Sequence, residues 1–191
     1  VHELRGICDG VLVGAGTAGS DDPVLLPPTG SECGPFLRCV LDPGLDLSPG
    51  ARLFREGPWS PVLIYARDDA DVSRRIALEQ AGAQVVPLPA DPESGRLDPR
   101  DVSRDLARRG VLGMILEGGG RTVGHFLDAG LVDKWYWYLA PGLLGDPEAR
   151  PAVHGSARRL DASWRGRIAG VRLLGDDMLL KLYPDPNSTG S

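Results

Sequence analysis

The feature that most constrains the fold of this chain is a run of three glycines, Gly118 to Gly120. The apolar residues 111–116 before the run are typical of a buried strand. Residues 122–129 after it are typical of a short helix that ends at Gly130. The glycines therefore lie where a strand passes into the N-terminus of a helix.

Such a junction is suited to binding an anion. A helix N-terminus carries unpaired amides and the positive end of the helix dipole, and glycine lets a ligand approach the backbone closely. Arg121 adds a positive charge, so a nucleotide phosphate would suit this position. The alternative is a tight turn in which glycine only relieves steric crowding, because this run does not follow the GxGxxG pattern.

Composition and charge exclude several classes of partner. The chain has 191 residues, enough for one domain with a proper core, and a net charge of -5. Acidic and basic residues are interspersed, which disfavours nucleic acid and anionic membranes. No apolar run approaches the roughly 20 residues that cross a bilayer, and no signal-peptide pattern opens the chain. We therefore expect a soluble, cytoplasmic protein.

The cysteines and histidines do not form a recognisable metal motif. Cys8, Cys33 and Cys39 are odd in number and lack CxxC spacing, so free thiols are favoured over disulfides or a zinc site. His125 follows the glycine junction and is a candidate for contact with a phosphate or ribose, with a helix-surface position as the equal alternative. His154 is expected in a loop. We predict no metal.

The two ends of the chain differ in character. Residues 1–8 resemble the tail of a helix already under way, which is consistent with a fragment of a longer protein. Residues 187–191 are small and polar and are expected to form a disordered tail or a cloning remnant. We therefore assign one domain to residues 1–186.

A second glycine-rich segment follows the first expected strand. Residues 9–13 are apolar, and residues 14–19 match GxGxxG. A dinucleotide-binding fold of the Rossmann type would continue with a helix, but Pro23, Pro27 and Pro28 argue against one. The pattern therefore disfavours a Rossmann fingerprint, and a glycine loop that lines a ligand stays open as an alternative.

Strands and helices then alternate. Short apolar strands are expected at residues 36–42, 61–66 and 84–88, with the appearance of buried parallel strands. A helix is predicted over residues 71–81, with Val72, Ile76 and Ala77 facing inward.

A further helix is predicted over residues 99–109. Asp98 is placed to cap its N-terminus and Pro99 takes the first helical position. Val102 and Leu106 are expected to face inward, and the charged residues to form a solvated face.

The last third of the chain is expected to form antiparallel strands. Residues 132–141 form an aromatic strand, and residues 168–174 and 178–183 form a hairpin. We predict an α/β sandwich of three layers whose mixed central sheet begins parallel and ends antiparallel. Residues 135–138 (Trp-Tyr-Trp-Tyr) alternate sides, so one pair needs cover from a helix of the same chain or from a second subunit. We favour a subunit interface, and hence a homodimer.

Two stretches together carry a resemblance to a known family. Residues 11–23 (VLVGAGTAGSDDP), preceded by His2 to Arg5, form the first. The second runs from Leu116 to Gly145 and includes LEGGG, AGLVD and LAPGLLG. They resemble the C-terminal reductase domain of the bifunctional riboflavin-biosynthesis deaminase/reductase, whose fold is similar to dihydrofolate reductase. The closing LGDDML at residues 174–179 agrees in order and spacing.

This resemblance implies NADPH-dependent reduction of the ribosyl group of 5-amino-6-(5-phosphoribosylamino)uracil to ribityl, with the protein mainly orienting the reactants. It also implies a fused deaminase domain upstream and gives no catalytic acid or base. The residues implied to contact the cofactor are Thr17, Asp21, Gly119, Gly120, Arg121, Thr122, Val123, Gly124 and His125. Those implied to contact the substrate are Arg5, Leu25 and Glu117.

Four of the implied contacts have a structural alternative. Glu117 is alternatively a strand-end carboxylate held by neighbouring amides, and Arg5 a solvated helix charge. Thr17 and Asp21 are alternatively loop caps that form local hydrogen bonds.

The chain also departs from the family pattern. Members usually carry an arginine for the substrate phosphate where this chain has Pro28, and Ser and Arg where it has Pro43 and Asp46. The sequence begins at Val1, after the place of the family's first strand; if the protein itself lacked that strand, we would expect a central strand and part of the nicotinamide pocket to be lost with it. Three hypotheses follow: the riboflavin-pathway reductase, a related NAD(P)H reductase with another pyrimidine or pterin-like substrate, and a non-catalytic nucleotide-binding module.

Overall fold

The computed structural model describes seven segments of the chain: residues 2–28, 36–56, 62–143, 145–146, 148–149, 151–156 and 163–185. Cys33 and the expected tail at residues 187–191 lie outside them. Cys39 is a free thiol, as expected. None of the described helices is long and apolar enough to cross a membrane.

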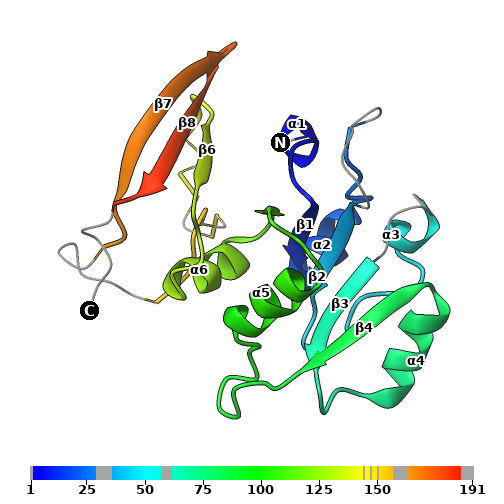
Figure 1. The fold of residues 1–191 in the computed structure, drawn as a ribbon. Coiled ribbons are helices and arrows are strands. Elements are labelled where there is room, and N and C mark those ends of the chain that lie inside the picture. Colours follow the sequence, from blue (N-terminus) through cyan, green and yellow to red (C-terminus); the bar gives the residue numbers. More distant parts are fainter. Residues whose placement is uncertain are drawn as a thin grey trace.

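A five-stranded parallel sheet forms the centre of the molecule (Figure 1). Its strand order is β4-β3-β2-β1-β5, and every neighbouring pair is parallel. The strands are β1 (Gly10–Gly14), β2 (Leu37–Leu41), β3 (Val62–Arg67), β4 (Ala83–Leu88) and β5 (Met114–Leu116). The predicted parallel strands are therefore confirmed.

Helices cover both faces of this sheet. One face packs against α2 (Ala15–Asp21), α3 (Arg52–Arg55) and α4 (Val72–Gln80), through Ala18, Leu53 and Leu78. The other packs against α5 (Pro99–Arg108) and α6 (Gly120–Asp128), through Val102, Leu106 and Phe126. A short helix, α1 (His2–Arg5), precedes β1. The three-layer arrangement follows from this double cover.

The central strand β1 shows why both faces must be apolar. Val11 and Val13 belong to the core beneath α2, α3 and α4, whereas Leu12 belongs to the core beneath α5 and α6. Successive side chains of a strand point to opposite faces. All five residues of β1 are consequently buried, as expected for a parallel strand between two helical layers.

The C-terminal strands form a sheet of their own. β6 (Trp135–Leu139), β7 (Gly166–Leu174) and β8 (Asp177–Pro184) pair antiparallel in the order β6-β8-β7. In Figure 1 this sheet stands apart from the parallel one, with α6 between them. The α/β class and the antiparallel hairpin are confirmed, but the single mixed sheet is corrected to two sheets. β5 and β6 are each an edge strand. Among the described residues no strand pairs with both of them, so no backbone hydrogen bonds join the two sheets into one.

One face of the antiparallel sheet is entirely apolar. Residues directly opposite one another in paired strands point to the same side, and the register forms three rows across the sheet. We call this set the apolar face: Trp135, Leu182 and Ile168; Trp137, Leu180 and Val171; and Leu139, Met178 and Leu173. Several of its members are largely exposed. On the opposite side, Lys134 lies over the rings of Tyr136 and Tyr183, each 5.4 Å away.

Three sequence predictions need correction. A helix does follow β1, because α2 takes in the second glycine segment and ends at Asp21, just before the prolines. Val72 and Ile76 of α4 are exposed, and Leu78 is the side chain that reaches the core. The strand expected from residue 111 begins at Met114: Leu112 is 97% exposed, and the amides of Leu112 and Gly113 donate to Oδ2 of Asp9 instead of to a neighbouring strand.

Candidate functional site

The glycine junction lies at the carboxyl end of two neighbouring strands. β5 ends at Leu116, and the amide of Glu117 continues the ladder by donating to the carbonyl of Leu12 over 3.0 Å. Gly118 then adopts a φ of +127°, a conformation that favours glycine. The carboxyl edge of a parallel sheet is where open α/β folds bind ligands, so the predicted junction occupies a suitable position.

The two glycine segments meet at this edge. Thr17 of α2 accepts a hydrogen bond from the amide of Gly119 through its Oγ1 atom, over 2.9 Å. A Cβ at Gly14 would collide with the Oγ1 atom of Thr122. We call this meeting of Gly14, Thr17 and residues 118–122 the glycine corner. The structure therefore brings together five residues of the implied cofactor set: Thr17, Gly119, Gly120, Arg121 and Thr122.

The first turn of α6 offers unpaired donors. α6 has nine residues and begins after Gly119 without a side-chain cap. Within the described residues, the amides of Gly120 and Arg121 have no hydrogen-bond acceptor. With the positive end of the helix dipole, these amides form a donor set that suits a phosphate. The donors present thus fit the pyrophosphate of a nicotinamide dinucleotide.

Packing within the chain explains two of the glycines. A Cβ at Gly120 would collide with the carbonyl of Pro151, and one at Gly124 would lie 2.5 Å from the carbonyl of His154. The amide of His154 also donates to the carbonyl of Gly120 over 2.9 Å. Residues 151–156 therefore lie against α6, and Gly120 and Gly124 admit this segment rather than a ligand at their Cα atoms.

Arg5 and Glu117 form a bidentate ion pair. Nε of Arg5 donates to Oε1 of Glu117 over 2.7 Å, and Nη2 donates to Oε2 over 2.6 Å. The side chains are only 16% and 17% exposed. Nη1 of Arg5 also donates to the carbonyl of Leu26 over 3.1 Å. The structure therefore joins the two charged residues of the implied substrate set to each other. The side chain of Glu117 is held by the guanidinium of Arg5, and its backbone by the hydrogen bond to Leu12 at the end of β5.

A second arginine, Arg38, also binds the backbone of the segment around Leu26. Arg38 of β2 is buried, and its Nη1 donates to the carbonyls of Val24, Leu53 and Glu56 over 3.3, 2.7 and 3.0 Å. Burial lowers the pKa of its guanidinium. Arg38 thus links backbone carbonyls inside the fold and is committed to that role.

Leu25 lies between these two anchors with its side chain in the core. It is buried and has a φ of +60°, which is unusual for a residue with a Cβ. A contact between Leu25 and a substrate would therefore have to come from its backbone.

Other implied residues lie further from these contacts. Asp21 is exposed and accepts a hydrogen bond from the neighbouring Ser20 hydroxyl over 2.7 Å. His125 lies in the later part of α6 and is half-buried; burial lowers its pKa, and the charge of Arg96 adds to the effect. No described side-chain contact joins Asp21 or His125 to the glycine corner. Val123 meets it through its backbone amide, which donates to the carbonyl of Gly119 over 3.3 Å.

The loop after β2 contains features that sequence analysis did not identify. Asp42 is buried and accepts the amides of Asp46 and Leu47 over 3.0 and 2.8 Å. Asp46 itself forms an ion pair with Arg74 of α4. A cavity of about 420 Å³ lies between this loop and α4, lined by Leu45, Asp46, Leu47, Ser48, Pro49, Ser73, Arg74, Ala77 and Leu78.

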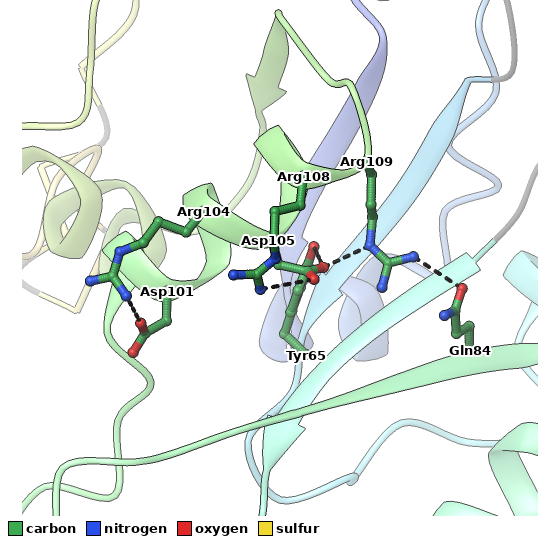
Figure 2. A network of polar contacts seen from close by, with 7 residues as sticks. All are labelled: Tyr65, Gln84, Asp101, Arg104, Asp105, Arg108 and Arg109. Atoms are coloured by element: carbon green, nitrogen blue, oxygen red, sulfur yellow. Dashed lines mark hydrogen bonds and ion pairs between the residues drawn. The ribbon is translucent and has the colours of Figure 1, made fainter.

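A polar network beneath α5 was also missed (Figure 2). The hydroxyl of buried Tyr65 donates to Oδ2 of Asp105 over 3.0 Å, and Nε of Arg109 donates to the same atom over 2.7 Å. Burial opposes ionisation of Asp105, but hydrogen bonds from Arg109 and Tyr65 outweigh it and lower its pKa. The charged face predicted as wholly solvated therefore includes one buried carboxylate with a structural role. No group of metal-ligating side chains occurs among the described residues.

Comparisons with known proteins agree with this architecture. The model of the RibD C-terminal domain matches residues 1–180. Riboflavin biosynthesis protein RibD of Bacillus amyloliquefaciens is 30% identical over 94% of this chain and 47% of its own length. Riboflavin biosynthesis protein PYRR of Arabidopsis thaliana, a chloroplastic protein, is 29% identical over 97% of this chain and 30% of its own length. The chain thus spans half or less of the length of these relatives.

Solved structures share the fold. Acinetobacter baumannii RibD, form 2, superposes with a TM-score of 0.78 at 22% identity, covering 96% of this chain and 49% of that one. A pyrimidine reductase-like protein from Corynebacterium diphtheriae gives a TM-score of 0.78 at 21% identity, covering 96% and 79%. At these identities the likeness concerns the fold.

Proposed function

The chain belongs to the RibD C-terminal domain family, and from that premise we propose that it is an NADPH-dependent reductase of a ribosylaminopyrimidine. The substrate implied is 5-amino-6-(5-phosphoribosylamino)uracil, whose ribosyl group is reduced to ribityl in riboflavin biosynthesis. The observation that carries the proposal is the glycine corner, where open amides of α6 and the Thr17 hydroxyl lie beside Glu117.

In this proposal the chain's residues orient the reactants. Bound NADPH would supply a hydride to the sugar carbon. The amides of Gly120 and Arg121 would hold the pyrophosphate, with Arg121 adding charge. Glu117, fixed by Arg5, would accept hydrogen bonds from the substrate. Asp21, Thr122, Val123, Gly124, His125 and Leu25 remain predicted contacts. Holding two reactants in contact contributes a large part of the rate in such reactions.

A fluorescence titration with NADPH tests the proposal. Gly119→Val should weaken NADPH binding by roughly tenfold or more, because a side chain would stand before the open amides. The fold should survive, since a Cβ at Gly119 would lie 3.5 Å from the Thr17 hydroxyl. Gly113→Val is the matched control, because a Cβ there meets nothing within 4 Å and the residue precedes β5 at its other end. Absence of NADPH binding in the unchanged protein would refute the reductase function.

The same titration with NADH addresses the choice of cofactor. NADPH is the family expectation, but Asp46 brings a carboxylate, paired with Arg74, to the loop where the family commonly has arginine. A second candidate function, a related NAD(P)H reductase with another pyrimidine or pterin-like substrate, is favoured by Pro28. NADPH binding without substrate-dependent oxidation would instead favour the third candidate, a non-catalytic nucleotide-binding module.

We also propose that the protein is a homodimer. The support is the apolar face of the antiparallel sheet, where Ile168, Val171 and Leu173 are more than half exposed. Apolar patches of this kind mark interfaces in soluble proteins. A fused deaminase domain remains a prediction from the resemblance.

A further inference from the structure

β7 is an edge strand of the antiparallel sheet. The strand order is β6-β8-β7, and among the described residues only β8 pairs with β7. In Figure 1 this strand, drawn in orange, lies on the outer side of its sheet. The backbone on the free side of an edge strand can pair with an extended peptide, which then becomes the next strand of the sheet.

One face of β7 is apolar and open to solvent. Ile168, Val171 and Leu173 belong to the apolar face, and each is more than half exposed. A strand added at the free side of β7 would lie directly beside these side chains. It would cover them only if its own residues on that face were apolar.

The other face of β7 carries cations. Arg167 and Arg172 lie opposite residues of β8 that point away from the apolar face, so both arginines share that side. Lys181 of β8 supplies a third cation between them. It lies opposite Gly170, where a Cβ would be 3.9 Å from the Cβ of Lys181. In this row β7 therefore adds no side chain between the lysine and the free edge.

The three cations occupy three successive rows of the sheet. The rows are two residues of β8 apart, which corresponds to about 6.8 Å and matches the repeat of same-face side chains in any neighbouring strand. The ion pairs found among the described residues join side chains between residues 5 and 117, and none includes Arg167, Arg172 or Lys181. Carboxylates at alternate positions of an added strand would thus each meet one cation.

The same cations disfavour other occupants. Charged residues on an edge discourage pairing with a strand that cannot neutralise them, so a basic or wholly apolar strand fits poorly. A single-stranded nucleic acid would match the cations but not the apolar side of β7, and the net charge of -5 opposes a long polyanion.

We propose that the free edge of β7 binds, by strand addition, an extended segment of a partner protein in which acidic and apolar residues alternate. The acidic side chains meet Arg167, Lys181 and Arg172, and the apolar ones extend the apolar face beside Val171 and Leu173. This inference goes beyond the reductase function and does not depend on it, because the glycine corner lies on the other sheet.

Calorimetric titration with synthetic peptides is the first test. The probe is a peptide of alternating glutamate and valine about six residues long, the usual length of a strand. One control peptide has the same residues in two blocks, and another alternates lysine and valine. The alternating acidic peptide should bind about tenfold or more tightly than either control, and added salt should weaken its binding.

Two results of this titration would overturn the inference. One is failure of the alternating acidic peptide to bind at about 1 mM. The other is equally tight binding of a single-stranded oligothymidylate, which would show a general anion surface rather than a site for a strand.

Hydrogen exchange tests whether the peptide pairs with the edge. Amides of β7 should exchange more slowly when the acidic peptide is bound. The same peptide methylated on every backbone nitrogen keeps its charges but cannot donate to a strand, so it should not bind. If self-association of the unchanged protein alone slows exchange in β7 and excludes the peptide, the occupant is a second copy and the inference is wrong.

A charge reversal at the edge is the third test. Arg172→Glu should weaken binding of the acidic peptide by about tenfold or more and improve binding of the basic one. Arg104→Glu makes the same change of charge on α5, where the exposed Arg104 pairs with Asp101, and should leave binding within about threefold. Urea unfolding verifies that both variants fold. Equal losses in the two variants would mean that net charge, and not the edge of β7, attracts the peptide.

Discussion

The two sheets of this molecule solve the problem of covering apolar surface in different ways. All of β1 in the parallel sheet is buried between helices of the same chain, whereas most residues of β7 in the antiparallel sheet are exposed. Parallel strands need crossover connections, and the helices in those connections cover the sheet. A hairpin needs only a tight turn and brings no cover of its own. Within the described residues, helices of the chain therefore cover the first sheet but leave parts of the apolar face of the second exposed, and a partner for that face is what the dimer proposal supplies.

Truncation of one leucine in each sheet gives the largest expected contrast. Leu12 is 1% exposed and Leu173 is 70% exposed. Leu12→Ala should cost about 2–5 kcal/mol of unfolding free energy, because it removes buried contacts and leaves a cavity. Leu173→Ala should stay within about 0.5 kcal/mol at low protein concentration. Urea unfolding measures both values, and equal losses at every concentration would show that the contrast between the sheets is wrong.

Loss of a polar contact should also cost more unfolding free energy in the parallel-sheet region than in the antiparallel sheet. Asp105→Ala leaves the buried Tyr65 hydroxyl without its acceptor and should cost about 1–3 kcal/mol. Lys134→Ala removes an exposed cation–π contact of the antiparallel sheet and should cost about 0.5–1 kcal/mol. Thermal unfolding of the two variants measures which of them loses more stability. A larger loss of stability in Lys134→Ala than in Asp105→Ala would contradict the comparison.

The proposed dimer can be tested at two adjacent residues of β7. Val171→Glu places a charge on the apolar face and should raise the dimer dissociation constant by about tenfold or more, equal to about 1.4 kcal/mol. Arg172 points to the other side of the sheet, so Arg172→Glu should leave dissociation within about threefold. Analytical ultracentrifugation measures both. A monomer in the unchanged protein at micromolar concentration would end the dimer proposal.

The smallest expected effect is a mild acid sensitivity of the parallel-sheet region. Because the pKa of His125 is lowered by burial, the unfolded chain binds the proton more readily than the folded one. The free energy of unfolding therefore has its full value at a pH above the ordinary pKa of histidine, and it decreases as the pH falls through that pKa. His125→Gln should remove this loss, which is about 0.5 kcal/mol at most since solvent screens a half-exposed group. Unfolding measured on both sides of that pH checks the sign.

Local patterns predicted much of the fold. Asp98 caps α5 through the amide of Arg100 over 2.8 Å, Pro99 takes the first helical position, and Val102 and Leu106 are buried, all as the sequence indicated. Capping and periodicity depend on neighbours in the chain, which is why they can be read locally.

Contacts across long sequence separations could not be predicted in this way. Arg5 and Glu117 were each expected to meet a ligand, yet they are 112 residues apart and bind each other. The resemblance included Gly124 in the cofactor set, and only the tertiary structure shows that the backbone of His154 and Gly155 packs against it. Asp105 looked like one charge of a solvated face, and only the tertiary structure places Tyr65 beneath it.

The break between β5 and β6 has a practical consequence for anyone who handles this polypeptide. Each of these strands ends its sheet with backbone donors and acceptors on one side that no described strand takes up. Open strand edges recruit extended peptides and template aggregation. An extended peptide that pairs with either edge should therefore slow amide hydrogen exchange in the strand that it joins.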